Sequence, residues 1–393
     1  METCHLAWPF FEQSHRQLAK ALEEWLPLVA EEIEGSEEDD PRGAACRWIH
    51  QLGKAGWLRY CVPKEWGGVH ESLDVRSLCL ARETLAQRSG LADFAFAMQG
   101  LGSAPISFFG SRELRQRYLP GVATGQRVAA FALSEPEAGS DIGAIRTTAR
   151  RKGDVYILNG TKTWISNAGL ANFYVIFART GEGRHDLSAF VLDADTPGLR
   201  VSEQIRVSAP HPLGTLVLED CRVAEDQRLG QEGQGYEIAL ATLDIFRTTV
   251  GAAALGFAHR ALKEALRHVQ RRVAFGKPLA RFQLVRQKIA EMALEVDASA
   301  LLVYRAAWVQ DVQGSRGTCE ASMAKWFATE AAQRVVDRAV QLLGALGVVW
   351  GNPVERLYRE VRALRIYEGT SEIQTLIVAK HVLHEDADQD PRP

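Results

Sequence analysis

A glutamate followed by glycine, threonine and serine stands near the C-terminal end of the sequence, in Arg365-Ile-Tyr-Glu368-Gly-Thr-Ser-Glu372-Ile-Gln374. Glycine has no Cβ, so the backbone beside it can turn sharply and approach a ligand closely. A carboxylate next to such a turn can point into a cavity, where it suits the role of a general base. An isolated Glu-Gly-Thr is more often a solvated helix end, so this interpretation depends on the rest of the chain.

A second segment, far upstream, has the composition of a cofactor-binding loop. Phe131-Ala-Leu-Ser-Glu-Pro-Glu-Ala-Gly-Ser-Asp141 is rich in glycine and in small hydrogen-bonding residues. Such a chain can place its backbone N–H groups around an anionic or polyvalent group. Taken together, the two segments predict proton abstraction beside a large bound cofactor.

Both motifs resemble those of the flavin-dependent acyl-CoA dehydrogenase family, and the resemblance extends over nearly the whole chain. It implies FAD as cofactor and an acyl-CoA substrate that is oxidised to the trans-2-enoyl-CoA. Glu368 matches the glutamate of the family's Tyr-Glu-Gly-Thr motif, which removes the pro-R α-proton while the β-hydrogen leaves as hydride to N5 of FAD. Some branched-chain and long-chain relatives supply this glutamate from the position of Phe246, which is apolar here, so Glu368 is the single candidate.

The resemblance also assigns a flavin-facing wall in the middle of the chain. Phe131, Leu133 and Ser134 would lie along the isoalloxazine ring, and Trp164 with Ser166 would close the other side, with Ser166 near N5. Taken singly, Trp164 is more often a core aromatic and Ser166 a strand-end hydroxyl. The functional interpretation rests on the spacing of Lys162-Thr-Trp-Ile-Ser-Asn-Ala, which is that of the family.

Other cofactor contacts are expected from two loops. Gly139 and Ser140 would contact the pyrophosphate or the thioester-bearing ligand. Arg272, Phe275 and Gln283 belong to Arg271-Arg-Val-Ala-Phe-Gly-Lys-Pro-Leu-Ala-Arg-Phe-Gln283, which in the family reaches the FAD of a neighbouring subunit. A guanidinium suits a diphosphate because its planar fork makes paired, charge-assisted hydrogen bonds. The alternative is a solvated basic turn between helices.

The remaining site residues lie toward the C-terminus. Gln341 and Ala345 match the family's Gln-x-x-Gly-Gly cofactor contact, except that Ala345 replaces the second glycine; Thr370 and Glu372 complete the expected cofactor set. Asp244 and Arg247 lie three apart on one face of an expected helix, and by resemblance they hold the CoA moiety together with Ser140 and Gly369. Without the resemblance, Asp244 and Arg247 would be interpreted as a surface ion pair.

Composition excludes several other classes of protein. The 393 residues fit two or three packed units, and a net charge of −3 gives no reason to expect nucleic-acid binding. The apolar run Thr249–Phe257 is too short to span a bilayer, so no membrane is expected. Acidic residues early in the chain argue against a mitochondrial presequence, and we expect a cytoplasmic protein. Six scattered cysteines without metal-ligand spacing predict neither a metal site nor a disulfide framework.

The periodicity along the chain predicts an α+β fold. Residues 1–125 are expected to form a helical N-terminal domain, with a charged loop at 34–41. Residues 126–232 change to strand periodicity and predict a small central β-domain, a barrel or sandwich, in which Asn159-Gly160 has the composition of a two-residue hairpin turn. Residues 233–393 return to helical periodicity and predict a C-terminal four-helix bundle. Three- and four-residue steps predict one apolar face of a long helix, made of Ile289, Met292, Val296, Ala300, Val303 and Ala307. The expected strands are Val155–Leu158, Thr161–Ser166, Phe173–Phe177, Leu187–Leu192 and Leu216–Glu219.

Partners and alternative functions follow from the same resemblance. Electrons would pass to an electron-transfer flavoprotein, and the chain would form a homo-oligomer, either tetramer or dimer. The alternatives are a dehydrogenase of carrier-protein thioesters, a flavin oxidase or monooxygenase, and a non-catalytic binding member of the family. Phe94, Phe96 and Met98 add bulk that favours short, branched or cyclic acyl chains, and the segment Pro210-His211-Pro212 departs from the family pattern.

Overall fold

The computed structural model describes residues 4–384, and its contacts divide the chain into two compact units. Unit 1 comprises Met1–Leu26, Val75–Gly90 and Asp244–Pro393, as far as these are described. Unit 2 comprises Pro27–Asp74 and Leu91–Leu243. The predicted helix, sheet, helix order of an α+β chain is confirmed, while the three-domain division along the sequence stays a prediction.

The N-terminal third is helical, as its periodicity predicts. The charged loop separates the first two long helices. Pro41 begins the second helix, where backbone N–H groups have no partner within the helix, so the N–H that proline lacks is not missed. Asp40 accepts a hydrogen bond from the Gly43 amide at 2.9 Å and so caps that helix. The elements are η1 Cys4–Ala7, α1 Gln13–Glu34, α2 Pro41–Lys54, η2 Trp57–Cys61, η3 Lys64–Trp66, α3 Val75–Arg88, α4 Gly90–Phe109 and α5 Arg112–Ala123.

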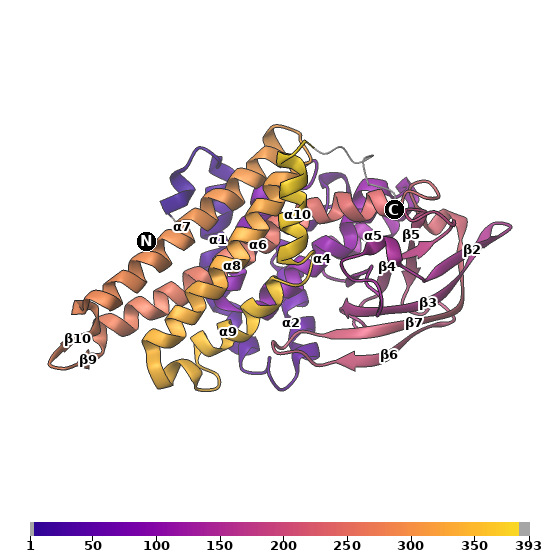
Figure 1. Cartoon of the computed structure of the whole chain (residues 1–393). Helices are drawn as coiled ribbons and strands as arrows, with labels where there is room; N and C mark the ends of the chain where they lie inside the picture. The colour runs from indigo at the N-terminus through magenta and orange to yellow at the C-terminus, as the bar shows by residue number, and fades with distance from the viewer. Residues whose placement is uncertain (1–3, 385–393) are drawn as a thin grey trace. The chain divides into compact units, whose positions relative to one another are not determined.

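Unit 2 contains a mixed sheet of eight strands (Figure 1). Its order is β6-β7-β3-β2-β4-β5-β8, with β1 pairing in parallel to β4. Alternate side chains of these strands point into one buried cluster that includes Tyr156, Ile176 and Phe190. The strands are β1 Ala129–Ala132, β2 Thr148–Lys152, β3 Val155–Ser166, β4 Phe173–Arg179, β5 Leu187–Asp193, β6 Leu199–Ile205, β7 Leu213–Ala224 and β8 Arg228–Leu229, with short turns η4 Ile142–Ala144 and η5 Glu225–Gln227.

The hairpin expected at Asn159-Gly160 is wrong, because β3 runs unbroken through both residues. Asn159 exchanges hydrogen bonds with Asp220 of the adjacent β7 at 3.0 and 2.8 Å, and the register shifts there as in a β-bulge. A Cβ on Gly160 would lie 2.3 Å from Thr147 Oγ1. A glycine is therefore needed at position 160 because the neighbouring backbone approaches closely. Two-residue turns also favour Asn-Gly, so the sequence alone could not distinguish the two cases.

The C-terminal part of unit 1 is a bundle of three long helices and two short ones. Within it, α8 packs against α7, α9 and α10 (Figure 1). Of the predicted apolar face, Ile289 is half-buried, and the others are buried, namely Met292, Val296, Ala300, Val303 and Ala307. The elements are α6 Gly235–Arg271, β9 Val273–Ala274, β10 Lys277–Pro278, η6 Leu279–Arg281, α7 Gln283–Val312, α8 Thr318–Leu343, η7 Gly344–Val348, α9 Pro353–Leu364 and α10 Ser371–Val382.

Among the described residues one helix, α6, is long and apolar enough to cross a bilayer by length and composition alone. However, 83% of its most apolar window is buried inside the protein. Burial of this kind is typical of a core helix, whose apolar surface is removed from water by its neighbours.

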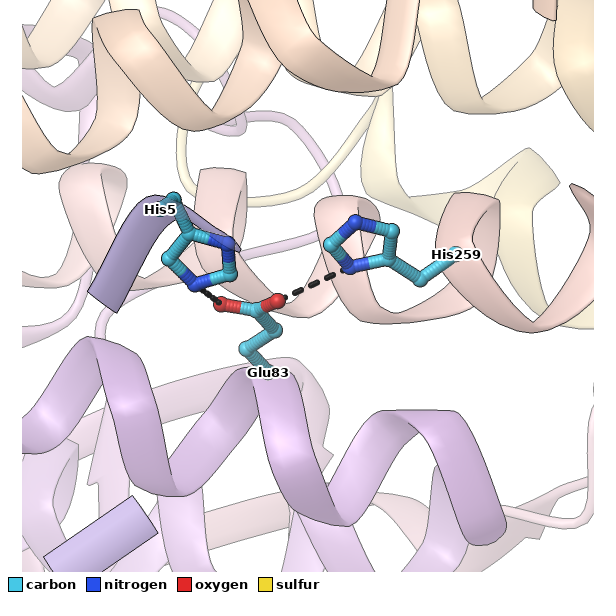
Figure 2. Close-up of side chains that lie close together, drawn as sticks. All are labelled: His5, Glu83 and His259. Carbon is cyan, nitrogen blue, oxygen red and sulfur yellow. Dashed lines mark hydrogen bonds and ion pairs between the residues drawn. The ribbon is translucent and has the colours of Figure 1, made fainter. Parts of the chain in front are cut away.

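A group of four polar side chains, three buried and one half-buried, fixes the N-terminal segment to the helices of unit 1. Glu83 of α3 accepts a hydrogen bond from Nδ1 of His259 on α6 at 2.9 Å and lies 3.4 Å from Nε2 of His5 (Figure 2). The hydroxyl of Tyr304 donates to the same carboxylate, and the His5 ring stacks on the Tyr304 ring. The potential ligand atoms of the histidines and Glu83 lie within 4.8 Å of one another. Both carboxylate oxygens already accept from these donors, so the group is satisfied as an ion pair.

Charge makes this group sensitive to pH in a definite direction. Burial opposes the charged form of His5, but Glu83 outweighs it and raises the pKa of His5 above its ordinary 6.5. Burial likewise opposes ionisation of Glu83, yet His5 and His259 hold the pKa of Glu83 well below its ordinary 4.5. The His5 contribution to stability is therefore lost as pH rises through its raised pKa, and the Glu83 contribution is lost only in acid.

We expect Glu83→Gln to lower the free energy of unfolding by roughly 3 kcal/mol at about pH 5.5, because removing one charge leaves its buried partner uncompensated. The penalty should be smaller at an alkaline pH above the raised pKa of His5, where the ring is neutral in both states. Urea unfolding followed by circular dichroism at the two pH values measures the difference. An equal penalty at both pH values would show that the charge of His5 does not contribute.

Candidate functional site

The Glu368 turn, residues 365–371, joins α9 to α10 with two consecutive residues at positive φ. Glu368 has φ +53° and Gly369 has φ +90°. A non-glycine residue rarely adopts this conformation, which costs of order 1–3 kcal/mol and persists where the surroundings impose it, often at functional sites. Thr370 ends the turn by capping α10, since its Oγ1 accepts from the Ile373 amide at 3.4 Å.

Side chains from three helices hold the two carbonyl groups of this turn. Nε2 of Gln374, on α10, donates to the Glu368 carbonyl at 3.2 Å and to the Gly369 carbonyl at 3.0 Å. Nε of Arg247, on α6, donates to the Glu368 carbonyl at 3.4 Å. Nζ of Lys325, on α8, donates to the Gly369 carbonyl at 2.5 Å. The peptide that carries the predicted base is therefore fixed on both sides.

Glu330, one turn beyond Lys325 on α8, fixes the two ends of the same turn. Its Oε1 accepts from Nε of Arg365 at 2.7 Å and from Oγ of Ser371 at 2.6 Å. The Ser371 amide donates back to the Arg365 carbonyl at 3.1 Å and closes the loop. Conformational freedom of the turn is thus restricted before any ligand binds.

Asp244 and Arg247 form a buried ion pair, with Arg247 Nη1 3.3 Å from Asp244 Oδ1. Asp244 also accepts from Thr318 at 3.0 Å and pairs with Arg316 at 3.1 Å. Burial raises the pKa of Asp244 above its ordinary value, although the two arginines and Thr318 oppose this shift. Asp244 and Arg247 are therefore buried and do not form the surface ion pair of the alternative interpretation. Asp244 holds Arg247 where it donates to the Glu368 carbonyl.

The predicted flavin wall is assembled by the sheet of unit 2. The Thr163 amide donates to the Ser134 carbonyl at 3.0 Å, which brings the two wall segments side by side. Phe131, Ser134 and Ser166 are half-buried and Leu133 is buried. Trp164, at φ +60°, leaves 58% of its surface exposed, so its indole is available for stacking and is not the core aromatic of the alternative interpretation.

An ion pair inside unit 2 supports this wall. Lys162 Nζ lies 2.7 Å from Glu135 Oε1 and donates to the Leu133 carbonyl at 3.0 Å. Glu135 in turn accepts from the amides of Arg146 and Thr147 at 2.6 and 3.0 Å. Burial opposes ionisation of Glu135, but Lys162 and these donors lower the pKa of Glu135 below its ordinary value. The loop from Leu133 to Thr147 is therefore organised by one carboxylate.

The loop residues Gly139 and Ser140 are exposed, and a Cβ built on Gly139 would meet no atom within 4 Å. No residue between 4 and 384 requires a glycine there, whereas the close approach of a polar ligand to the backbone would. With the exposed indole and the half-buried hydroxyls of Ser134 and Ser166, the residues present fit a large aromatic cofactor that carries phosphates.

The other predicted cofactor residues lie on exposed parts of unit 1. Arg272 and Gln283 flank a small hairpin of β9 and β10, and Phe275 at its tip has φ +51° and is 93% exposed. Gln341 and Ala345 are exposed beside Gly344, which ends α8. Glu372 is exposed in the first turn of α10, where hydrogen bonds to its own amide and to Thr370 lower its pKa. Because these side chains are exposed, they do not contribute to the packing of the core.

Sequence reasoning missed Lys325, Glu330, Gln374 and Glu135. Lys325 stands among small and apolar residues in Ala321-Ser-Met-Ala-Lys-Trp-Phe-Ala328, and a lone cation in such a run was a usable signal. Gln374 follows the motif directly but has the composition of an ordinary helix residue. Glu330 gave no signal, because its partners lie in a turn 35 and 41 residues away.

Comparisons with known proteins agree along the chain. The sequence matches the acyl-CoA dehydrogenase N-terminal domain over residues 12–126, the middle domain over 130–221 and the C-terminal domain over 233–383. The human mitochondrial short-chain specific acyl-CoA dehydrogenase is 41% identical over 85% of this chain and 82% of its own length. Cyclohexane-1-carbonyl-CoA dehydrogenase of Geobacter metallireducens is 36% identical over 94% and 96%. The structure of butyryl-CoA dehydrogenase from Megasphaera elsdenii has a TM-score of 0.89 at 32% identity, over 95% and 99%.

We expect Gly369→Ala to lower the free energy of unfolding by about 1 to 2 kcal/mol, because alanine is strained at this φ. Its Cβ would also lie 2.5 Å from Nε2 of Gln374 and displace that donor. The matched control is Gly35→Ala, where a Cβ meets nothing within 4 Å. Chemical denaturation of both variants tests this. An unchanged stability for Gly369→Ala would mean that the turn relaxes easily and is not imposed by its surroundings.

Proposed function

The chain belongs to the acyl-CoA dehydrogenase family, and from that premise we propose that it oxidises an acyl-CoA thioester to the trans-2-enoyl-CoA with Glu368 as the base. Family membership makes it a flavin-dependent oxidoreductase that acts on CH–CH bonds, with FAD as cofactor. The observation that carries the proposal is the Glu368 turn, a carboxylate in a costly backbone conformation held by Lys325, Gln374 and Arg247.

The chemical demand on Glu368 explains why such a rigid turn is useful. The α-proton of a thioester is barely acidic in water, so the base must be positioned and the developing enolate charge stabilised. We propose that the Glu368 carboxylate takes the α-proton and that its backbone N–H donates to the thioester oxygen. A donor aimed at such an oxygen in a dry site contributes on the order of 3 kcal/mol. Substrate contacts from Ser140, Asp244, Arg247 and Gly369 would hold the rest of the thioester.

FAD, when bound, supplies at N5 the acceptor for the hydride that leaves the β-carbon. In this proposal Phe131, Leu133, Ser134, Trp164 and Ser166 hold its ring system and exclude water from one side. The residues expected along its phosphates and adenosine are Gly139, Ser140, Arg272, Phe275, Gln283, Gln341, Ala345, Thr370 and Glu372.

The acyl chain is proposed to be short, branched or cyclic. Phe94 is buried on α4, and the ring of His211 packs against it with centroids 4.6 Å apart. The Pro210-His211-Pro212 segment thereby adds bulk to the aromatic residues of α4, which leaves less room for a long tail. Relatives named for short-chain and cyclohexane-carbonyl substrates support the same range.

An electron-transfer flavoprotein is proposed as the electron acceptor, and a homo-oligomer, tetramer or dimer, as the working form. Exposed apolar side chains in unit 1 support an assembly, since Phe275, Leu346, Val348 and Trp350 are each more than half exposed. A cytoplasmic location is proposed as well. A carrier-protein thioester remains the second candidate substrate, because it presents the same pantetheine arm as CoA.

We expect Glu368→Gln to keep FAD and to bind substrate, but to reduce its flavin at least ~10²-fold more slowly, because a positioned base contributes about that much. Anaerobic titration with acyl-CoAs of increasing chain length, followed by bleaching of the flavin, measures this. The panel includes a C12 thioester and one acyl carrier protein thioester. Glu368→Asp is the matched control, because it keeps the carboxylate and shortens its reach.

Each outcome of this titration has a definite meaning. Reduction of Glu368→Gln at the parental rate would refute Glu368 as the base. Fast reduction of the flavin by the C12 thioester would refute only the proposal that the acyl chain is short. Bleaching by the carrier-protein thioester and by no CoA ester would replace the substrate and leave the reaction class intact.

We expect Arg272→Ala to weaken FAD binding by roughly 1.5–3 kcal/mol, the scale of a hydrogen bond to a charged group. If Arg272 serves the cofactor of a neighbouring subunit, added FAD should also raise the oligomer fraction by mass action. The control is Arg267→Ala. Arg267 is an exposed arginine of α6 that pairs with Glu264, also on α6, at 3.2 Å. Equilibrium dialysis and light scattering provide the data. A fully flavinated monomer, or unchanged affinity in Arg272→Ala, would give the hairpin a purely structural role.

A further inference from the structure

Lys325 is a cation buried in the middle of a helix of small residues. Its side chain has no exposed surface, and Ala321, Ala324 and Ala328 around it on α8 are also buried. Removing an ammonium group from water is costly unless it is paired and hydrogen-bonded. Its hydrogen bond is to the Gly369 carbonyl, immediately after Glu368. A buried charge has therefore been retained next to the proposed base.

The charged groups that face Lys325 come from four elements. Glu368 lies in the turn, Arg247 on α6, Glu330 on α8 itself and Glu372 on α10. Burial lowers the pKa of Lys325 to about 8, and Glu368 is the strongest of the acidic groups that oppose this shift. Near neutral pH Lys325 is thus an ammonium whose principal counter-charge is Glu368.

A purely mechanical role would not require this charge. Gln374 already donates a neutral hydrogen bond to the Gly369 carbonyl at 3.0 Å and another to the Glu368 carbonyl at 3.2 Å. Glu330 already fixes both ends of the turn through Arg365 and Ser371. What Lys325 adds to these contacts is a positive charge in a site from which water is largely excluded, where charges interact more strongly than in water.

We propose that Lys325 is the positioning residue of Glu368, orienting its turn through the Gly369 carbonyl and keeping its carboxylate ionised so that it can accept the α-proton. The inference rests on the proposed role of Glu368 as the base. Because a desolvated carboxylate tends to take up a proton and a nearby cation opposes this, the enzyme would need the lysine most when substrate excludes water from the site.

The test is the pH dependence of anaerobic flavin reduction in Lys325→Gln, Lys325→Arg and Lys325→Met, each as the flavin-loaded enzyme. We expect Lys325→Gln and Lys325→Met to reduce flavin roughly 10- to 100-fold more slowly at neutral pH. Their rates should also begin to fall at a pH about one unit higher on the acid side, because the carboxylate loses its neighbouring cation. Lys325→Arg, which keeps the charge, should retain the parental acid limb even if its rate is lower.

Glu83→Gln is the matched control, because it also disturbs a buried charge of unit 1. Its partner His259 lies twelve residues from Arg247 on α6, or about 18 Å along the helix. We expect this control to lose stability and to keep the parental acid limb. If Lys325→Met does not fold, the comparison of Lys325→Gln with Lys325→Arg decides the question.

The outcomes separate this inference from the proposed function. Parental rates at neutral pH and a parental acid limb in Lys325→Gln would overturn the positioning role, provided that Glu368→Gln is inactive. An identical shift of the acid limb in Lys325→Gln and Lys325→Arg would also overturn it, since the charge would then not matter. If Glu368→Gln itself reduces flavin normally, the proposed function fails first, whatever the lysine variants do.

Discussion

The carbonyl group of Gly369 is the point on which the catalytic part of the structure depends. Two residues at positive φ precede α10, and such a backbone persists only when its carbonyl groups are held from outside. Lys325 from α8 and Gln374 from α10 converge on this oxygen, and Arg247 holds the preceding carbonyl. The backbone that carries the Glu368 side chain is therefore held by helices that are far apart in sequence, and its conformation follows from the packing of unit 1.

The same physical solution recurs in two other segments of the chain. Glu135 and Lys162 organise the loop of the flavin wall within unit 2, and Glu83 holds the N-terminal segment through His5 and His259 within unit 1. In each case a buried charge is paired, and its remaining hydrogen-bonding capacity is directed at backbone or aromatic groups. Breaking such a group is expensive because it leaves a buried charge without compensation.

The sequence predicted most of the architecture, because periodicity reports directly which faces are buried. The strands from Phe173 and Leu187 and the helix containing Met292 and Val296 appear where alternation and three- or four-residue spacing placed them. The prediction at Asn159-Gly160 was wrong because a bulge and a turn both select a glycine with unusual backbone freedom. The family and its cofactor were predicted from short motifs whose combination is specific.

The supporting residues of the site were less accessible to sequence reasoning. Gln374 and Glu135 act through hydrogen bonds to backbone groups, which residue identity does not reveal. Glu330 acts on the side chains of Arg365 and Ser371, which lie 35 and 41 residues away along the chain. Arg247 was assigned to the CoA moiety, and only the structure brings it to the Glu368 carbonyl. A contact with CoA and the contact with this carbonyl are compatible, because one guanidinium has several donors.

The central claim, that Glu368 takes the α-proton, is tested most directly by an exchange experiment. A thioester deuterated at the α-carbon is incubated anaerobically with excess enzyme in ordinary water, and loss of deuterium is followed by mass spectrometry in the parent and in Glu368→Gln. The account predicts loss in the parent and a rate at least ~10²-fold lower in the variant. Loss of deuterium at the parental rate in Glu368→Gln would contradict it.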